Sequence, residues 1–132
     1  MAQKENNIIP MIFDEAFYRK MATQKWRQQD YKKAAEYYEK VLELSPEDFD
    51  IQQHYAQCLV KLNIGKKAEH LFYENIVKDF HVAESFYELS QLNIELNEPN
   101  KAFLFGINYV ILSDDKDFRE MLEKTFEVTY TN

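Results

Sequence analysis

The sequence has 132 residues, with 16 Lys and Arg against 23 Asp and Glu and a net charge of −7. A chain of this length forms one domain with a sizeable core, and its acidic balance disfavours nucleic acid, because binding to phosphates depends on Lys and Arg. A single cysteine, Cys58, excludes an internal disulfide, and no apolar run is long enough to span a membrane, which favours a cytoplasmic protein. A secreted chain without its leader would share these features.

The N-terminal segment, residues 1–13, divides into two parts. Residues 2–7 are polar, whereas residues 8–13 are apolar around Pro10, which disfavours a helix. We treat residues 1–13 as a tail that precedes the helical domain. Its apolar part is expected to pack on the first hairpin as a cap; the alternative is that it mediates dimerisation or occupies a groove.

Three helical hairpins are predicted next, because apolar residues recur with helical spacing. The six helices are expected at residues 14–28, 31–44, 51–62, 66–78, 82–96 and 99–112. We assign them to a single domain, residues 14–132, with repeats at about 15–48, 49–82 and 83–116.

The joints between these helices hold residues that favour helix ends. Ser45 and Pro46 are expected to cap and to begin the third helix. Asn63 and Gly65 suit the left-handed turn after that helix, and Asn97 takes the matching position in the third hairpin.

Gly106 is an exception inside a predicted helix, because Tyr38 and Phe72 place aromatic rings at the corresponding positions. Glycine there costs roughly 1 kcal/mol of stability against alanine. We expect a ring from the last helix to pack on the exposed backbone of Gly106; a ligand cleft is the alternative.

The last predicted helix spans about residues 117–129 and has one apolar face. That face is expected to comprise Phe118, Met121, Leu122, Thr125 and Phe126. Repeat arrays need a polar-backed helix to cover their last hairpin, so we interpret this one as a capping helix. A fragment of a longer array is the alternative.

Small residues recur through the hairpins at one constant interval, which we call the repeat register. One column holds Ala34, Ala68 and Ala102, and a second holds Ala22, Ala56 and Ser90. Small side chains allow the axes of paired helices to approach closely. An interval of this length is typical of repeated helical hairpins.

Residues 29–46, QDYKKAAEYYEKVLELSP, closely resemble the second-helix signature of tetratricopeptide repeats. The resemblance covers about residues 15–116 as three repeats and is strongest in the first. It implies an all-α fold of about seven helices, arranged as a right-handed superhelix of antiparallel pairs. The first helices of the pairs would line a concave groove that binds a peptide or partner segment.

This resemblance also implies which side chains face the groove. They are Arg19, Thr23, Trp26, Arg27, Gln53, His54, Gln57, Glu84, Tyr87, Glu88 and Gln91. Trp26, Arg27 and Tyr87 are the expected anchors, because aromatic and Arg side chains dominate binding hot spots.

Family members that grip the C-terminal tails of heat-shock chaperones hold the terminal carboxylate with basic and amide side chains. The matching positions here hold Arg19, Thr23, His54, Glu84 and Glu88. Each of the two glutamates would repel a nearby carboxylate by roughly 1–4 kcal/mol. We therefore expect no binding of an acidic chaperone tail.

Motifs for catalysis or metal binding are missing from the sequence. His54 and Cys58 are four residues apart on one predicted helix, but a closed zinc site needs four ligands and no second pair is present. Glycine-rich phosphate loops, zinc-protease motifs and serine elbows do not occur. We expect no catalytic residue, no metal and no cofactor.

The predicted function is a non-enzymatic adaptor or scaffold that binds a protein or peptide, with no nucleic-acid partner and no membrane span. A bacterial secretion chaperone is the alternative within the binding class, since three repeats, an apolar N-terminal segment and an acidic balance are similar to that group. A homodimer formed through the N-terminal segment or a terminal stacking surface is the third hypothesis.

Overall fold

Seven α-helices make up the part of the chain that the computed structural model describes, residues 14–126, and that part contains no strand. The helices are α2 (Glu15–Arg27), α3 (Tyr31–Leu44), α4 (Phe49–Lys61), α5 (Gly65–Val77), α6 (Val82–Glu95), α7 (Pro99–Ser113) and α8 (Lys116–Thr125). The all-α prediction is confirmed, and the predicted helices lie close to these bounds. The apolar segment at residues 8–13 lies outside the described residues.

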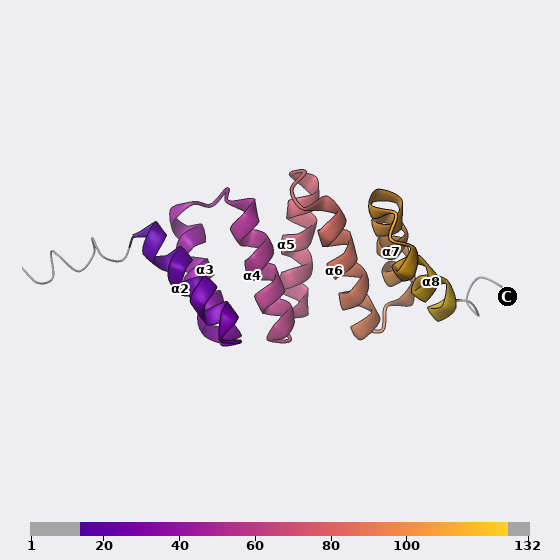
Figure 1. The fold of residues 1–132 in the computed structure, drawn as a ribbon, viewed down its shortest axis with the longest axis horizontal. Coiled ribbons are helices and arrows are strands. Elements are labelled where there is room, and N and C mark those ends of the chain that lie inside the picture. Colours follow the sequence, from indigo (N-terminus) through magenta and orange to yellow (C-terminus); the bar gives the residue numbers. More distant parts are fainter. Residues whose placement is uncertain (1–13, 127–132) are drawn as a thin grey trace, which may run out of the picture. The chain divides into compact units, whose positions relative to one another are not determined.

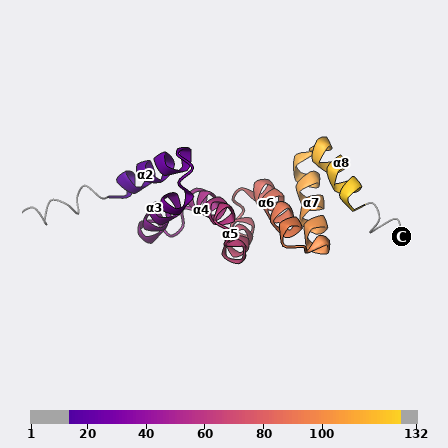
Figure 2. The same ribbon diagram turned by 90° about the horizontal axis from the view of Figure 1, so that it is seen from below.

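The chain divides into two compact units, Met1–Ile64 and Gly65–Asn132. In the first unit α2 packs against α3 and α3 against α4; in the second, α5 packs against α6, α6 against α7 and α7 against α8 (Figures 1 and 2). Short turns join successive helices, so the packed neighbours within each unit run antiparallel.

The turn inside each repeat contains one residue with left-handed backbone. Gln29, Asn63 and Asn97 occupy equivalent positions of the repeat register and have φ angles of 60°, 62° and 58°. In each turn the next N–H donates to the carbonyl of the fifth preceding residue at 2.8–2.9 Å, which satisfies a carbonyl at the helix end. The predicted turn roles of Asn63 and Asn97 are confirmed. The prediction for Gly65 is wrong, because its φ is not positive and it begins α5.

The start of α4 also differs from the prediction. Asp48, and not Ser45, is the N-cap: its carboxylate accepts a hydrogen bond from the Ile51 N–H at 3.1 Å, and α4 begins after Pro46, at Phe49. Asp14 caps α2 in the same way, at the equivalent position one repeat earlier. Because Asp48 accepts the bond from the Ile51 N–H, the Ser45 hydroxyl is left to bond elsewhere.

Both columns of small residues lie in the core, as the repeat register predicts. Ala22, Ala34, Ala56, Ala68, Ser90 and Ala102 are all 0% exposed. The Ser90 hydroxyl donates to the Ala102 carbonyl at 2.8 Å, so the two columns meet between α6 and α7. A larger side chain at either position would separate these helices.

The space beside Gly106 is filled by a leucine and not by an aromatic ring. A Cβ added to Gly106 would lie 2.7 Å from Leu122 Cδ1 and 3.0 Å from Ser90 Oγ. The last helix therefore does cover this backbone, as expected, but the prediction of a ring is wrong. The alternative of a ligand cleft at Gly106 is also wrong, because Leu122 leaves no room there.

The capping helix is present as α8, although it ends at Thr125 and residues 127–129 lie outside the described part. Phe118, Leu122 and Phe126 are buried and form a cluster with Ala102 of α7. Thr125 was expected on the apolar face but is exposed, and its hydroxyl donates to Met121 Sδ at 3.3 Å.

Candidate protein-binding surfaces

Arg19 is held by its own chain in the first unit. Its Nε lies 3.1 Å from Glu15 Oε2, and its Nη2 forms an ion pair with Asp48. The Ser45 hydroxyl donates to the other oxygen of Glu15. This network links the start of α2 to the turn before α4, so the guanidinium that could have bound a ligand carboxylate is already paired.

The network lowers the pKa of both carboxyl groups. The hydrogen bond from Ser45, followed by that from Arg19, lowers the pKa of Glu15. Burial would raise the pKa of Asp48, but hydrogen bonds from Arg19 and from the Ile51 N–H lower it overall. Hydrogen bonding to Asp48 raises the pKa of Arg19. All three groups are therefore charged at neutral pH.

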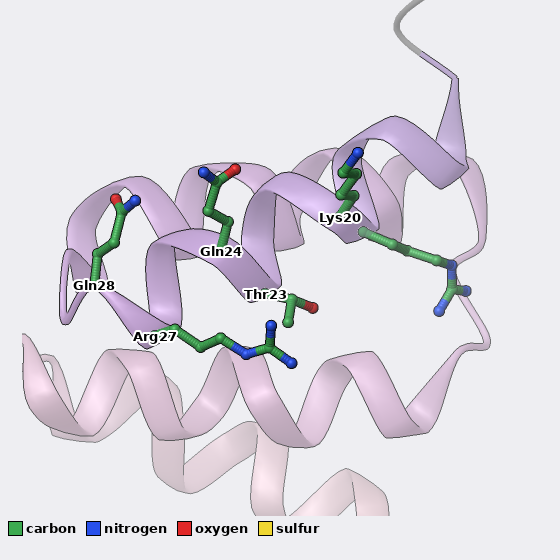
Figure 3. A pocket seen from close by; sticks show the side chains of 6 residues that line it. Lys20, Thr23, Gln24, Arg27 and Gln28 are labelled. Atoms are coloured by element: carbon green, nitrogen blue, oxygen red, sulfur yellow. The ribbon is translucent and has the colours of Figure 1, made fainter.

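An open hollow of about 690 Å³ runs along α2 (Figure 3). It is lined by Arg19, Lys20, Thr23, Gln24, Arg27 and Gln28. Figure 3 shows Lys20, Gln24 and Gln28 in one row along the helix and Thr23 and Arg27 in the neighbouring row. No acidic residue is among these lining residues. The side chains that line the hollow are thus all polar or basic, and their charge balance is positive.

Two cations in this hollow are available to a partner. Lys20 and Arg27 are exposed, and neither forms an ion pair with another residue in the described part of the chain. Thr23 and Gln24 beside them are exposed as well. Thr23 and Arg27 were predicted to face the groove, whereas Lys20, Gln24 and Gln28 were not, although their polar row at i, i+4 and i+8 is visible in the sequence.

The remaining predicted residues of the first unit have mixed surroundings. Trp26 is half-buried and meets the ring of Tyr31 edge-on at 5.2 Å between centroids. His54 is exposed and Gln57 is half-buried. Gln53 is only 1% exposed, so it is no part of an open surface, contrary to the expectation.

In the second unit the predicted residues lie on α6. Glu84 and Gln91 are exposed, and Glu88 is half-buried. Tyr87 is half-buried among aromatic rings, 5.1 Å from Tyr109 and 5.2 Å from Phe118 between centroids. Tyr87 therefore connects α6 to α7 and α8, whatever it contributes to binding.

Tyr109 adds a polar link to this aromatic cluster. Its hydroxyl donates to Asp115 at 2.6 Å, and Asp115 also caps α8 by accepting from the Phe118 N–H at 2.9 Å. The hydrogen bond to Asp115 raises the pKa of Tyr109, and the same bond lowers the pKa of Asp115. The end of α7 and the start of α8 are thereby fixed together.

The groove residues of α2 and α4 belong to one unit and those of α6 to the other. Their assembly into one concave groove stays a prediction. The same is true of the expected failure to bind an acidic chaperone tail, which depends on Glu84 and Glu88.

Cys58 and His54 differ in accessibility. Cys58 is 0% exposed, and burial raises the pKa of its thiol to about 12, whereas His54 is exposed. Among residues 14–126, no three His, Cys, Asp or Glu side chains are grouped so that they could hold a metal ion. Over the same range, no helix combines the length and apolar character needed to cross a bilayer.

Comparison with known proteins gives one family and one fold. The tetratricopeptide repeat family matches residues 25–72, which fall in the first two predicted repeats. A solved structure described as the crystal structure of MamA protein is similar in fold, with a TM-score of 0.75 and 19% sequence identity over 87% of this chain.

The present chain spans 63% of the length of that MamA chain. No curated protein matches the sequence. The family match confirms the resemblance inferred from residues 29–46, and the fold comparison extends the repeat architecture over most of the chain. We conclude that residues 25–72 match the tetratricopeptide repeat family and that the chain has the fold of a helical repeat protein.

Proposed function

We propose that the protein is a non-enzymatic interaction module, an adaptor or scaffold, that binds a segment of a partner protein. The observation that carries this proposal is the hollow on α2, where Lys20 and Arg27 are exposed, have no ion-pair partner among residues 14–126, and lie between amide and hydroxyl groups. Such a surface provides charge and hydrogen-bond donors without a catalytic constellation.

The partner segment contacts α2 through Thr23, Arg27 and Lys20. Amide side chains such as Gln24 and Gln28 can bond a peptide backbone without selecting particular side chains, whereas the two cations favour acidic side chains in the partner. A surface of this size buries an area at the low end for protein interfaces. We therefore expect roughly micromolar affinity.

A charge-reversal experiment tests this surface. The Lys20→Glu/Arg27→Glu variant and the wild-type protein are used to capture partners from cell extract, and each purified partner is then titrated by calorimetry. We expect the variant to weaken binding of the true partner by at least about 10-fold, because two favourable charge contacts become repulsive.

Lys32→Glu/Lys33→Glu on α3 is the matched control. Both lysines are exposed in the same unit, so this variant has the same change in net charge away from the hollow. It should bind the partner as the wild type does. Equal binding by all three proteins would show that the hollow on α2 is not the binding surface.

A further inference from the structure

α7 presents an uncharged outward face, which distinguishes it from the equivalent helices. From Ala102 to Ser113 the sequence AFLFGINYVILS contains no charged residue. Leu104, Ile111 and Leu112 are 61%, 73% and 55% exposed. Apolar residues on every side of a helix are typical of one that is covered on every side.

The repeat register shows that this face is specific to α7. Its outward positions hold Leu104, Asn108 and Ile111. The corresponding positions of α3 hold Glu36, Lys40 and Glu43, all exposed, and those of α5 hold His70, Glu74 and Val77. The same structural position thus changes from fully charged in the first repeat to uncharged in the third.

A groove adjoins this face. It has a volume of about 510 Å³ and runs between α7 and α8, with Phe103, Ile107, Val110 and Leu122 among its apolar lining. Ile111 lines the groove and is also part of the exposed stripe, so the two are continuous. A ridge of apolar side chains beside a groove can interlock with a second such surface.

The order of residues along the stripe is symmetric. Asn108 lies in the middle, Leu104 precedes it by four residues, and Ile111 and Leu112 follow it by three and four. A second copy packed antiparallel across a two-fold axis at Asn108 would place apolar residues against apolar residues. Asn108 is exposed, its Nδ2 donates to the Leu104 carbonyl at 2.8 Å, and its Oδ1 can accept from the other copy.

We propose that α7 is a self-association face, on which a second copy of this chain packs antiparallel about Asn108. Charge limits where two copies can meet: copies with a net charge of −7 repel one another over most of their surface, whereas residues 102–113 carry no charge. The charged side chains that line the adjoining groove, Asp114, Arg119 and Glu123, include both signs. Such an interface is isologous, because each copy contributes the same ridge and the same groove. A single polar residue in an apolar stripe also specifies register.

The mass of the full chain in solution tests the proposal. Sedimentation equilibrium at roughly 1–500 µM should show a reversible shift from one chain toward two, since an interface of this size is expected to be weak. Leu104→Glu/Ile111→Glu should raise the dimer dissociation constant by at least about 100-fold, because like charges would face each other. A wild-type protein that stays monomeric throughout overturns the proposal and leaves α7 to another partner.

Val77→Glu is the matched control. Val77 is 80% exposed and occupies the position of Ile111 one repeat earlier, in the same unit. This variant should dimerise within about twofold of the wild type. At a protein concentration where the wild type is monomeric, circular dichroism should show native helix content and an unchanged thermal midpoint for all variants. A dimer that survives the glutamates in α7 contradicts the proposed face.

Mixing two complementary variants tests the antiparallel register. In the proposed arrangement, residue 104 of one copy lies near residues 111 and 112 of the other. Leu104→Glu and Ile111→Lys should each be monomeric alone, whereas their mixture should form a heterodimer with one opposite-charge contact and one apolar contact. A mixture that stays monomeric while the wild type dimerises overturns the antiparallel arrangement.

Discussion

α3 and α7 are the second helices of the first and third repeats, and they show how one architecture acquires two different surfaces. Both bury the alanine of the repeat register, Ala34 and Ala102, at 0% exposure. Their outward positions are opposite in character. α3 exposes Glu36, Lys40 and Glu43, and Lys40 Nζ lies 3.8 Å from Glu43 Oε2. α7 exposes Leu104 and Ile111 at the corresponding positions.

This difference separates the constraints on the fold from those on function. The side chains in the two buried columns must stay small, because larger ones would push the packed helices apart. Outward positions are free to change, so they can acquire a binding role without disturbing the fold. The charged face of α3 suits water, and the uncharged face of α7 suits a second protein surface.

The third repeat differs from the first in its core as well, and Gly106→Phe tests that difference most severely. The substitution restores the ring that Tyr38 and Phe72 provide in the other repeats. Here, however, the Cβ alone would lie 2.7 Å from Leu122 Cδ1. We expect the variant to lose about 3 kcal/mol of unfolding free energy, measured by urea denaturation, because the site is overpacked.

Leu122→Ala in the Gly106→Phe background should recover part of that loss, since the smaller side chain makes room for the ring. The Leu122→Ala change alone should be destabilising, because it removes a buried side chain of α8. Purely additive effects of the two substitutions would show that the ring does not compete with Leu122 for the same space.

The two predicted aromatic anchors should differ in their effect on stability. Tyr87→Ala removes ring contacts to Tyr109 and Phe118 and should cost about 2 kcal/mol. Trp26→Ala removes an edge contact with Tyr31 and should cost about 1 kcal/mol. Chemical denaturation of both variants measures the difference. Equal costs would mean that Tyr87 has no special role in holding α6, α7 and α8 together.

Acid should weaken the network that is specific to the first unit. Hydrogen bonds from Ser45 and Arg19 hold the pKa of Glu15 below its usual value, and the pKa of Asp48 is also lowered in the folded state. Carboxyl groups with a lowered folded-state pKa stabilise the fold above their unfolded-state pKa, and this contribution disappears as the pH falls through the folded-state pKa. The urea midpoint should therefore begin to fall at about pH 5 and should continue to fall as the pH drops below about 4.

Arg19→Met should reduce this pH dependence, because it removes the charge that both carboxylates share. Arg119→Met on α8 is the control and should leave the pH dependence unchanged. Arg119 Nε lies 3.4 Å from Glu123 Oε1, in an exposed ion pair within one helix. An identical pH dependence in the wild type and Arg19→Met would contradict a stabilising role for the network.

Much of the architecture could be predicted from the sequence, because helix packing imposes the same requirement in every repeat. Small residues at Ala34, Ala68 and Ala102 and turn residues at Asn63 and Asn97 are direct consequences of close approach and left-handed backbone. The prediction that Ser45 caps α4 was wrong because Ser45 and Asp48 are both residue types that favour an N-cap. Only the path of the chain decides that Asp48 accepts the bond from the Ile51 N–H.

Surface roles were harder to predict. Burial of Gln53 and pairing of Arg19 with Asp48 depend on neighbours from other helices, which periodicity alone does not identify. The filling of the Gly106 site by Leu122 likewise depends on how α8 packs. The uncharged stretch in α7 was visible in the sequence, but its exposure was not.

Transplanting the outward residues of α3 onto α7 tests the central comparison most directly. The variant Leu104→Glu/Asn108→Lys/Ile111→Glu gives α7 the charges that Glu36, Lys40 and Glu43 give α3. Sedimentation equilibrium with urea denaturation should show a monomer at every concentration whose unfolding free energy lies within about 0.5 kcal/mol of that of the wild-type monomer. A variant that still dimerises, or a monomer that loses stability strongly, would contradict the assignment of this face to a second copy of the chain.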